Sequence, residues 1–168
     1  MALLRRGHLL CSFWGFMFRD DAAEALARAE FFDICDDAQR DKLAFASDLR
    51  RFDADDVLYK AGDVPTGAFV LVSGTIKAKP EGAGKPYAIS QEGSVVSAMA
   101  LILAKPRPVT FTAVTDCEAL FVPRSAFLKL VQQSPELAQR AVARVERELT
   151  GYLDALEPVG RRMKSLED

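Results

Sequence analysis

One stretch decides the fold of this chain: residues 93–111, which read GSVVSAMALILAKPRPVTF. A short apolar helical run, 98–103, is expected after Gly93 and ends before Pro106, which cannot continue a helix. Arg107 follows directly, between two prolines. The backbone amides at a helix N-terminus favour an anion, and an arginine supplies the countercharge to a phosphate. The stretch therefore predicts an anion-binding cradle inside a β-rich shell.

This stretch resembles the phosphate-binding cassette of the cyclic-nucleotide-binding domain family. The family includes the catabolite activator protein, the regulatory subunits of cAMP-dependent kinase and cyclic-nucleotide-gated channels. Its pattern is roughly G-x-x-F-G-E-x-A-L, followed shortly by P-R-x-A-T. Upstream, Gly62-Asp63 and the run 69–74 also match the family, so the resemblance covers about residues 23–156. The cassette positions that fit or nearly fit are Gly93, Val96, Ala100, Leu101, Pro106, Arg107, Val109 and Thr110.

The resemblance implies a non-enzymatic regulatory module that binds a ligand such as cAMP or cGMP and signals through its terminal helices. We expect no cofactor and no metal. The residues expected to contact the ligand are Arg107, Ser97, Ala98, Met99, Thr110, Val96 and Val70. Leu71 and Thr112 are expected to line the same pocket.

Three positions depart from the family pattern. Ser97 replaces a glycine, and Ala98 replaces the glutamate that, by resemblance, accepts a hydrogen bond from the ribose 2′-hydroxyl. Pro108 stands where relatives offer the phosphate an N–H or a serine, and proline has no N–H. Each lost charge-assisted bond is worth about 1.5–3 kcal/mol. We therefore expect weak binding of a cyclic nucleotide or another phosphorylated anion. The alternative is a closed pocket in an interaction or scaffold protein, with Arg107 only fixing its own loop.

Composition restricts the other function classes. The 168 residues, 49% of them hydrophobic, suffice for one domain with a sizeable core, and the net charge of −2 gives no general attraction to nucleic acid. Cys11, Cys35 and Cys117 are odd in number and widely spaced, which argues against a disulfide framework or a zinc site. His8 is the only histidine, so the chain provides neither a histidine cluster for a metal nor a Ser-His-Asp catalytic set. We do not expect an enzyme.

Residues 1–18 are set apart by two arginines followed by an apolar run about half as long as the ~20 residues that span a membrane. Three interpretations stay open. Met17 is the true start; the segment packs on the domain as a helix; or Trp14 and nearby phenylalanines anchor the chain at a membrane surface. We expect a cytoplasmic protein, with peripheral membrane association only under the third interpretation.

The rest of the chain predicts an α+β fold, an antiparallel double-stranded β-helix (β-roll or jelly roll) flanked by helices. An alanine-rich segment that Asp20 or Asp21 can cap indicates a helix over 22–29, and a second short helix is expected over 36–43. Between them, Phe31, Phe32 and Ile34 are expected to point inward. The run 68–72 is apolar throughout, which is typical of a strand buried on both faces. Strands are expected over 49–52, 57–59, 68–72, 75–79, 87–90, 109–113 and 117–122.

Two helices are expected after the strands, one capped by Ser125 over 126–131 and a longer one that Ser134 and Pro135 begin. The longer helix has an apolar heptad seam, which favours a homodimer through residues 136–156; packing on its own β-roll is the alternative. A helix-turn-helix would need roughly 60 further residues, so we expect no direct DNA binding and an unidentified protein partner. The seam comprises Val142, Val145, Leu149, Tyr152 and Leu156.

These expectations give a simple domain organisation. An apolar segment of uncertain status, 1–18, precedes a domain over 19–158. The tail 159–168 is basic and polar. Within the domain, helices are expected over 20–45, the β-roll over 47–124 and helices over 125–157.

Overall fold

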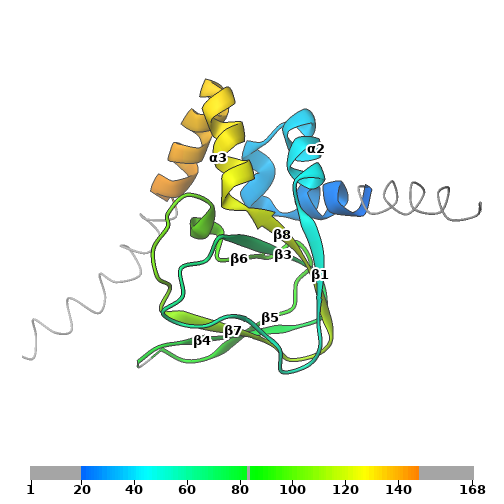
Figure 1. Ribbon diagram of the computed structural model, residues 1–168, viewed down its shortest axis with the longest axis vertical. Helices are drawn as coiled ribbons and strands as arrows, with labels where there is room; N and C mark the ends of the chain where they lie inside the picture. Colours follow the sequence, from blue (N-terminus) through cyan, green and yellow to red (C-terminus); the bar gives the residue numbers. More distant parts are fainter. Residues whose placement is uncertain (1–19, 83, 148–168) are drawn as a thin grey trace, which may run out of the picture.

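A computed structural model describes residues 20–82 and 84–147, and two antiparallel sheets of four strands dominate it (Figure 1). The first sheet has the order β1 (Asp48–Phe52), β8 (Cys117–Pro123), β3 (Gly67–Ser73), β6 (Val95–Val96). The second has the order β2 (Val57–Tyr59), β7 (Val109–Ala113), β4 (Ile76–Pro80), β5 (Tyr87–Ile89). The expected α+β β-roll is confirmed.

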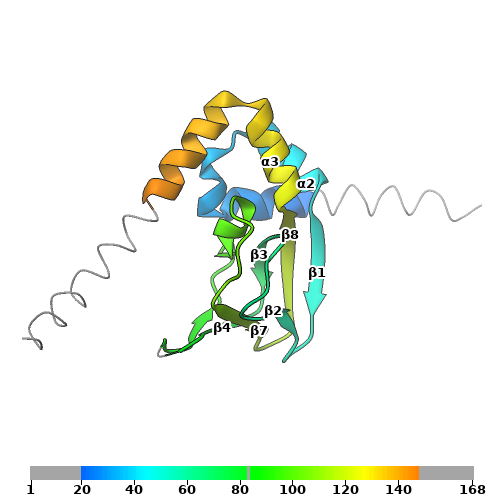
Figure 2. The same ribbon diagram turned by 60° about the vertical axis from the view of Figure 1, so that its left-hand side comes forward.

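The helices on either side of the roll gather against the first sheet, on the face turned away from the second sheet (Figures 1 and 2). They are a helix over 20–28, η1 (Glu30–Ile34), α2 (Asp37–Phe45), α3 (Arg124–Gln133) and a helix described over 135–147. A single short 3-10 helix, η2 (Ala98–Leu101), lies within the connection from β6 to β7. Helices before and after the roll in sequence are therefore neighbours in space.

Strand β3 separates two hydrophobic cores, as its uninterrupted apolar sequence predicted. Phe69 and Leu71 face the space between the sheets, whereas Ala68 and Val70 face the helices. Strand β8 alternates in the same way, because successive side chains of a strand point to opposite faces. Phe31, Phe32 and Ile34 are buried in the helix-side core, as expected. The two-residue β6 was missed because two residues are too few to show a period of alternation.

Helix boundaries follow local capping chemistry. Asp36 caps α2, accepting a 2.8 Å hydrogen bond from the Gln39 amide, while Gln39 Oε1 accepts one from the Asp36 amide at 3.0 Å. The Ser134 cap is also confirmed, since its Oγ accepts from the Leu137 amide at 3.3 Å. The expected Ser125 cap is wrong. Helix α3 begins at Arg124 with Pro123 at the N-cap position, where the fixed φ of proline ends strand β8.

The described part of the last helix packs one face on the domain. Leu137 and Ala141 are buried in the helix-side core, whereas Val142 is 57% exposed. The remaining heptad residues Leu149, Tyr152 and Leu156 lie outside the described residues, as do the segments 1–18 and 159–168. Dimerisation through this helix therefore stays a prediction. Among the described helices, none has both the length and the apolar character needed to cross a membrane.

Candidate functional site

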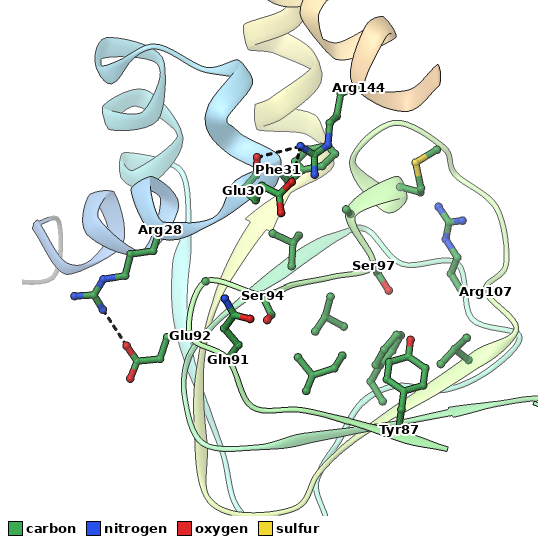
Figure 3. A pocket seen from close by; sticks show the side chains of 18 of the residues that line it. Arg28, Glu30, Phe31, Tyr87, Gln91, Glu92, Ser94, Ser97, Arg107 and Arg144 are labelled. Atoms are coloured by element: carbon green, nitrogen blue, oxygen red, sulfur yellow. Dashed lines mark hydrogen bonds and ion pairs between the residues drawn. The ribbon is translucent and has the colours of Figure 1, made fainter. Parts of the chain in front are cut away.

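An open cavity of about 1030 Å³ lies at the end of the roll, between the second sheet, the segment 91–99 and the terminal helices (Figure 3). Its size is at the upper end of the range of about 300–1,000 Å³ for small-molecule sites. Its lining residues are Arg28, Glu30, Phe31, Tyr87, Ile89, Gln91, Glu92, Gly93, Ser94, Val95, Val96, Ser97, Ala98, Met99, Arg107, Pro108, Val109, Phe111 and Arg144.

Arg107 lies on the cavity wall formed by the β6–β7 connection. Its backbone is fixed on both sides, because the Gly62 amide donates to the Arg107 carbonyl at 2.8 Å and the Arg107 amide donates to the Asp63 carbonyl at 3.1 Å. The Nε and Nη2 atoms of its side chain are buried. Figure 3 shows the guanidinium across the cavity from Arg28 and Glu92. A rigid backbone therefore presents a half-buried cation at one end of the cavity.

Ser97 holds a left-handed backbone conformation at the start of η2, with φ 60° and ψ 42°. Residues with a Cβ rarely adopt this conformation. The Ala100 amide donates to the Ser97 carbonyl at 2.8 Å, and the Ser97 side chain makes no capping hydrogen bond. The expected helical run 98–103 is shorter than predicted, since η2 ends at Leu101. One 3-10 turn has a small dipole, so Arg107 rather than the helix supplies most of the positive field at this end.

The structure brings five of the predicted site residues to the cavity. These are Val96, Ser97, Ala98, Met99 and Arg107. That they contact a ligand stays a prediction.

Val70 and Thr110 do not line the cavity, and neither do Leu71 and Thr112. Val70 lies on the helix side of β3, and Leu71 is completely buried between the sheets. On β7 the alternate residues Val109 and Phe111 face the cavity. Thr110 instead accepts a 3.0 Å hydrogen bond on Oγ1 from the Ala61 amide. The correction follows from strand alternation, which sends neighbouring residues to opposite faces.

Residues of the terminal helices line the cavity and were not predicted. Arg144 Nη1 lies 3.4 Å from both the Glu30 carbonyl oxygen and Glu30 Oε1. The Arg144 guanidinium also lies 5.9 Å from the centre of the Phe31 ring. The last helix is thereby joined to η1 at the edge of the cavity, as Figure 3 shows. Position 144 continues the buried face of residues 137 and 141 at helical spacing, which is the signal that would have identified it.

A second ion pair joins the helix over 20–28 to the turn before β6. Arg28 Nη1 lies 3.1 Å from Glu92 Oε2, and a second nitrogen of Arg28 pairs with Glu24. Both partners of the Arg28–Glu92 pair are at least half exposed, so its contribution to stability is small. Gly93 packs directly against the same helix. The cavity rim is therefore tied to helices at both ends of the domain.

Arg124 joins the β6–β7 connection to helix α3. Its Nε donates to the Ala100 carbonyl of η2, and its Nη2 donates to the Pro65 carbonyl. Leu101 of η2 is completely buried in the helix-side core. A displacement of η2 would therefore act on α3 through both a guanidinium and packed side chains.

The described residues contain no group of three or more His, Cys, Asp or Glu side chains placed to hold a metal ion. Burial raises the pKa of the Cys35 thiol to about 11 and also raises that of Cys117. A thiol held in its protonated form is a poor nucleophile and a poor ligand. The cavity itself presents the half-buried guanidinium of Arg107 beside apolar and aromatic walls.

Comparison with known proteins gives a consistent result. A family model described as "Cyclic nucleotide-binding domain" matches residues 49–134. The cAMP-dependent protein kinase regulatory subunit of Emericella nidulans is 28% identical over 102 residues, which cover 61% of this chain and 25% of that protein. Lysophospholipase nte1 of Aspergillus fumigatus is 29% identical over 117 residues, covering 63% of this chain.

The chain spans only a small part of these relatives, 8% in the case of the lysophospholipase. Among solved structures, cAMP-bound PfPKA-R superposes with a TM-score of 0.68 at 20% identity, covering 88% of this chain and 49% of that one. At this level of identity the likeness shows a common fold.

Proposed function

Since the chain belongs to the cyclic nucleotide-binding domain family, we propose that it is a non-enzymatic, ligand-sensing regulatory module. Its cavity binds a cyclic nucleotide or another phosphorylated anion weakly, and the terminal helices pass the signal to a protein partner in the cytoplasm. The observation that supports this proposal best is the half-buried guanidinium of Arg107 on the wall of an open cavity. Arginine is well suited to this role because its planar fork binds two phosphate oxygens at once.

Weak binding follows from what surrounds Arg107. The Ala98 side chain offers no hydrogen-bond acceptor to a sugar hydroxyl, and Pro108 offers no N–H to the phosphate. Two absent contacts, each worth about 1.5–3 kcal/mol, reduce affinity by a factor of roughly 100 or more, since about 1.4 kcal/mol corresponds to tenfold. A micromolar site would thus become a millimolar one.

The proposed signal travels by two routes. Arg124 connects η2 to α3, and the Arg144–Glu30 contact connects the last helix to the cavity edge. A ligand that interacts with the cavity only in one arrangement of these helices shifts the population toward that arrangement. The partner then reads the positions of the helices.

The test is a thermal-shift panel with cAMP, cGMP and cyclic dinucleotides on the wild type, Arg107→Ala and Arg51→Ala. Arg51 is a matched control, because its side chain is 77% exposed and pairs with Glu118 away from the cavity. Ligand binding to the native state raises its stability. We expect at least one nucleotide to raise the melting temperature of the wild type and of Arg51→Ala but not of Arg107→Ala. An equal shift in all three proteins would exclude the Arg107 site.

The second candidate is an interaction module that uses the same fold without a working pocket. The exposed Val142 and the half-buried Val145 on the last helix favour this candidate, since they leave apolar surface for a second copy of the chain. Light scattering of the wild type and Val142→Glu tests it. If the chain is an interaction module, the wild type should be a dimer and Val142→Glu a monomer. No nucleotide should then raise the melting temperature of the wild type.

A further inference from the structure

We propose that the apolar N-terminal segment, residues 9–18, docks on its own chain against a surface formed by Phe45 and Leu49 at the edge of the first sheet. Phe45 is the last residue of α2, and its side chain is 74% exposed. This is the highest value among the large apolar side chains that the structure describes as exposed. An apolar segment that covered this ring would remove its surface from water, which is favourable.

The surface continues from Phe45 onto strand β1. Leu49 pairs with Leu120 of β8, whose side chain lies in the helix-side core. Because paired residues of neighbouring strands share a face of the sheet, Leu49 also points to the helix side, where it is only half-buried. Strand β1 is the outer strand of its sheet, and no strand of the described residues lies beyond it. The helix-side core can therefore be extended at this edge by a further apolar element.

The segment joins the domain close to this surface, although it lies outside the described residues. The helix over 20–28 follows it directly, and Ala22 of that helix belongs to the same core as Ala44 of α2. Figures 1 and 2 both show this helix, in blue, beneath α2 near the point where α2 ends and β1 begins. A chain spans at most about 3.6 Å per residue. Residue 18 is thus close enough to Asp20 for the segment to reach Phe45.

The composition of the segment suits a core element. Every residue from 9 to 18 is apolar except Ser12 and Gly15, and residues 13, 14, 16 and 18 are aromatic. Aromatic rings pack favourably edge to face. The helix-side core already contains such a pair, since the ring centres of Phe31 and Phe32 lie 5.3 Å apart at 83°. The segment therefore carries the side-chain type that the exposed Phe45 ring would pack against.

The charges near the surface favour this occupant over a membrane. The adjoining stretches 19–21 and 41–48 contain four aspartates against one arginine and one lysine. All four aspartates are exposed, and such a surface repels anionic lipid headgroups. Arg5 and Arg6, just before the apolar run, are the only charged residues of 1–18. Their charge is complementary to that of the aspartates, which are Asp20, Asp21, Asp41 and Asp48.

Docking would also act on the cavity. Arg28 lies at the other end of the helix over 20–28, lines the cavity and pairs with Glu92 at 3.1 Å. A segment seated on Phe45 and Leu49 would hold the start of this helix against α2. The position of the cavity rim would then depend on whether the segment is docked.

Trp14 makes the inference testable, because it is the only tryptophan of the chain and its fluorescence reports on the segment alone. Emission and acrylamide quenching are measured on the full chain for the wild type, Phe45→Ser and Val57→Ser. Val57 is the matched control, since it is 43% exposed and lies on β2 of the second sheet, away from the helices. Both substitutions replace exposed apolar side chains, so both variants should fold, which melting temperatures verify.

We expect Trp14 to be shielded from acrylamide in the wild type and in Val57→Ser, without lipid and at every protein concentration. Phe45→Ser should shift the emission to longer wavelength and about double the quenching constant, because the segment loses apolar cover. Full access of acrylamide to Trp14 in the wild type, or equal quenching in the wild type and Phe45→Ser, would overturn the inference.

Two further results would assign the segment to another occupant and overturn the inference as well. Shielding that is lost on dilution, together with a dimeric mass in light scattering, would place the segment on a second copy of the chain. Shielding that appears only with vesicles of phosphatidylcholine and phosphatidylglycerol in equal parts would place it on a membrane.

Discussion

Gly62 fixes the position of Arg107: the Gly62 amide donates a 2.8 Å hydrogen bond to the Arg107 carbonyl. The neighbouring Asp63 carbonyl accepts from the Arg107 amide at 3.1 Å, so the two segments form a short backbone ladder. Gly62 has a φ of +89°, which favours glycine. A turn 45 positions earlier in the sequence thus determines where the cationic end of the cavity lies.

Gly93→Ala should destabilise the domain strongly. Gly93 has a φ of +82°, and a Cβ there would lie 2.6 Å from the Arg28 carbonyl oxygen. The left-handed conformation costs roughly 1–2 kcal/mol and the overlap adds about as much again, for a loss of about 3 kcal/mol. Urea unfolding measures this loss. Gly62→Ala is the control, because its φ is also positive but no atom lies within 4 Å of the added Cβ. A loss no greater than that of Gly62→Ala would contradict the packing described for Gly93.

Ser97→Gly should stabilise the domain. The left-handed conformation of Ser97 costs roughly 1–2 kcal/mol, and glycine recovers this while adding about 0.5–1 kcal/mol of chain entropy to be lost on folding. The expected net gain in the free energy of unfolding is about 0.5–1 kcal/mol. Ser97→Val provides the contrast, since a β-branched side chain is least tolerated at positive φ. If Ser97→Val were as stable as Ser97→Gly, the left-handed conformation described for residue 97 would be refuted.

Arg124→Ala should loosen η2 from α3. The guanidinium donates to the Ala100 and Pro65 carbonyls, and hydrogen bonds from a charged group are worth about 1.5–3 kcal/mol each. We expect a loss of about 2–4 kcal/mol of stability and faster amide hydrogen exchange in η2 and at the start of α3. Lys129→Ala, at an exposed position of the same helix, should change stability by less than about 0.5 kcal/mol. Unchanged exchange rates in η2 would exclude this link.

Tyr59 gives stability a distinctive dependence on alkaline pH. Burial raises the pKa of Tyr59 from 10.0 to about 12, and its hydroxyl donates to the Gly67 carbonyl at 2.9 Å. Because the folded pKa lies above the unfolded one, the stabilisation is complete below pH 10 and is lost as the pH rises toward 12. Tyr59→Phe should cost about 1 kcal/mol at neutral pH, and the gap to the wild type should narrow between these pH values. If the difference in stability between the wild type and Tyr59→Phe did not change with pH, Tyr59 would not be the group whose raised pKa stabilises the fold.

The regular parts of the fold could be predicted because their residues repeat with a clear period. Strand β2 lies at 57–59 as expected, and the uninterrupted apolar run of β3 correctly indicated burial on both faces. The helix expected over 36–43 corresponds to α2, Asp37–Phe45, for which Asp36 is the N-cap and not the first helical residue. The start of α3 could not be predicted from Ser125, because the preceding Pro123 takes the N-cap position.

The candidate site was only half predictable. The cassette residues near Arg107 follow one another in the sequence, so the pattern located them. Arg144 and Phe31 reach the cavity through the packing of helices that are far apart in the chain. The spacing of residues 137, 141 and 144 indicates a shared face of one helix, but it does not indicate which other element that face meets. Val70 and Thr110 do not line the cavity because neighbouring residues of a strand face opposite sides of its sheet. The sequence does not show which side faces the cavity: Val70 faces the helices, and Thr110 accepts a hydrogen bond from the Ala61 amide.

The most direct test of the central claim is side-chain NMR of the arginines. The ¹⁵Nε–¹H resonance of Arg107 is followed while the wild type is titrated with 5′-AMP and, separately, with cAMP, with Arg51 as the internal reference. We predict that the Arg107 resonance shifts in a saturable manner with at least one of the two ligands, that the Arg51 resonance stays in place, and that Arg107→Ala abolishes saturation. Saturable binding of either ligand without a change at Arg107 would contradict the account.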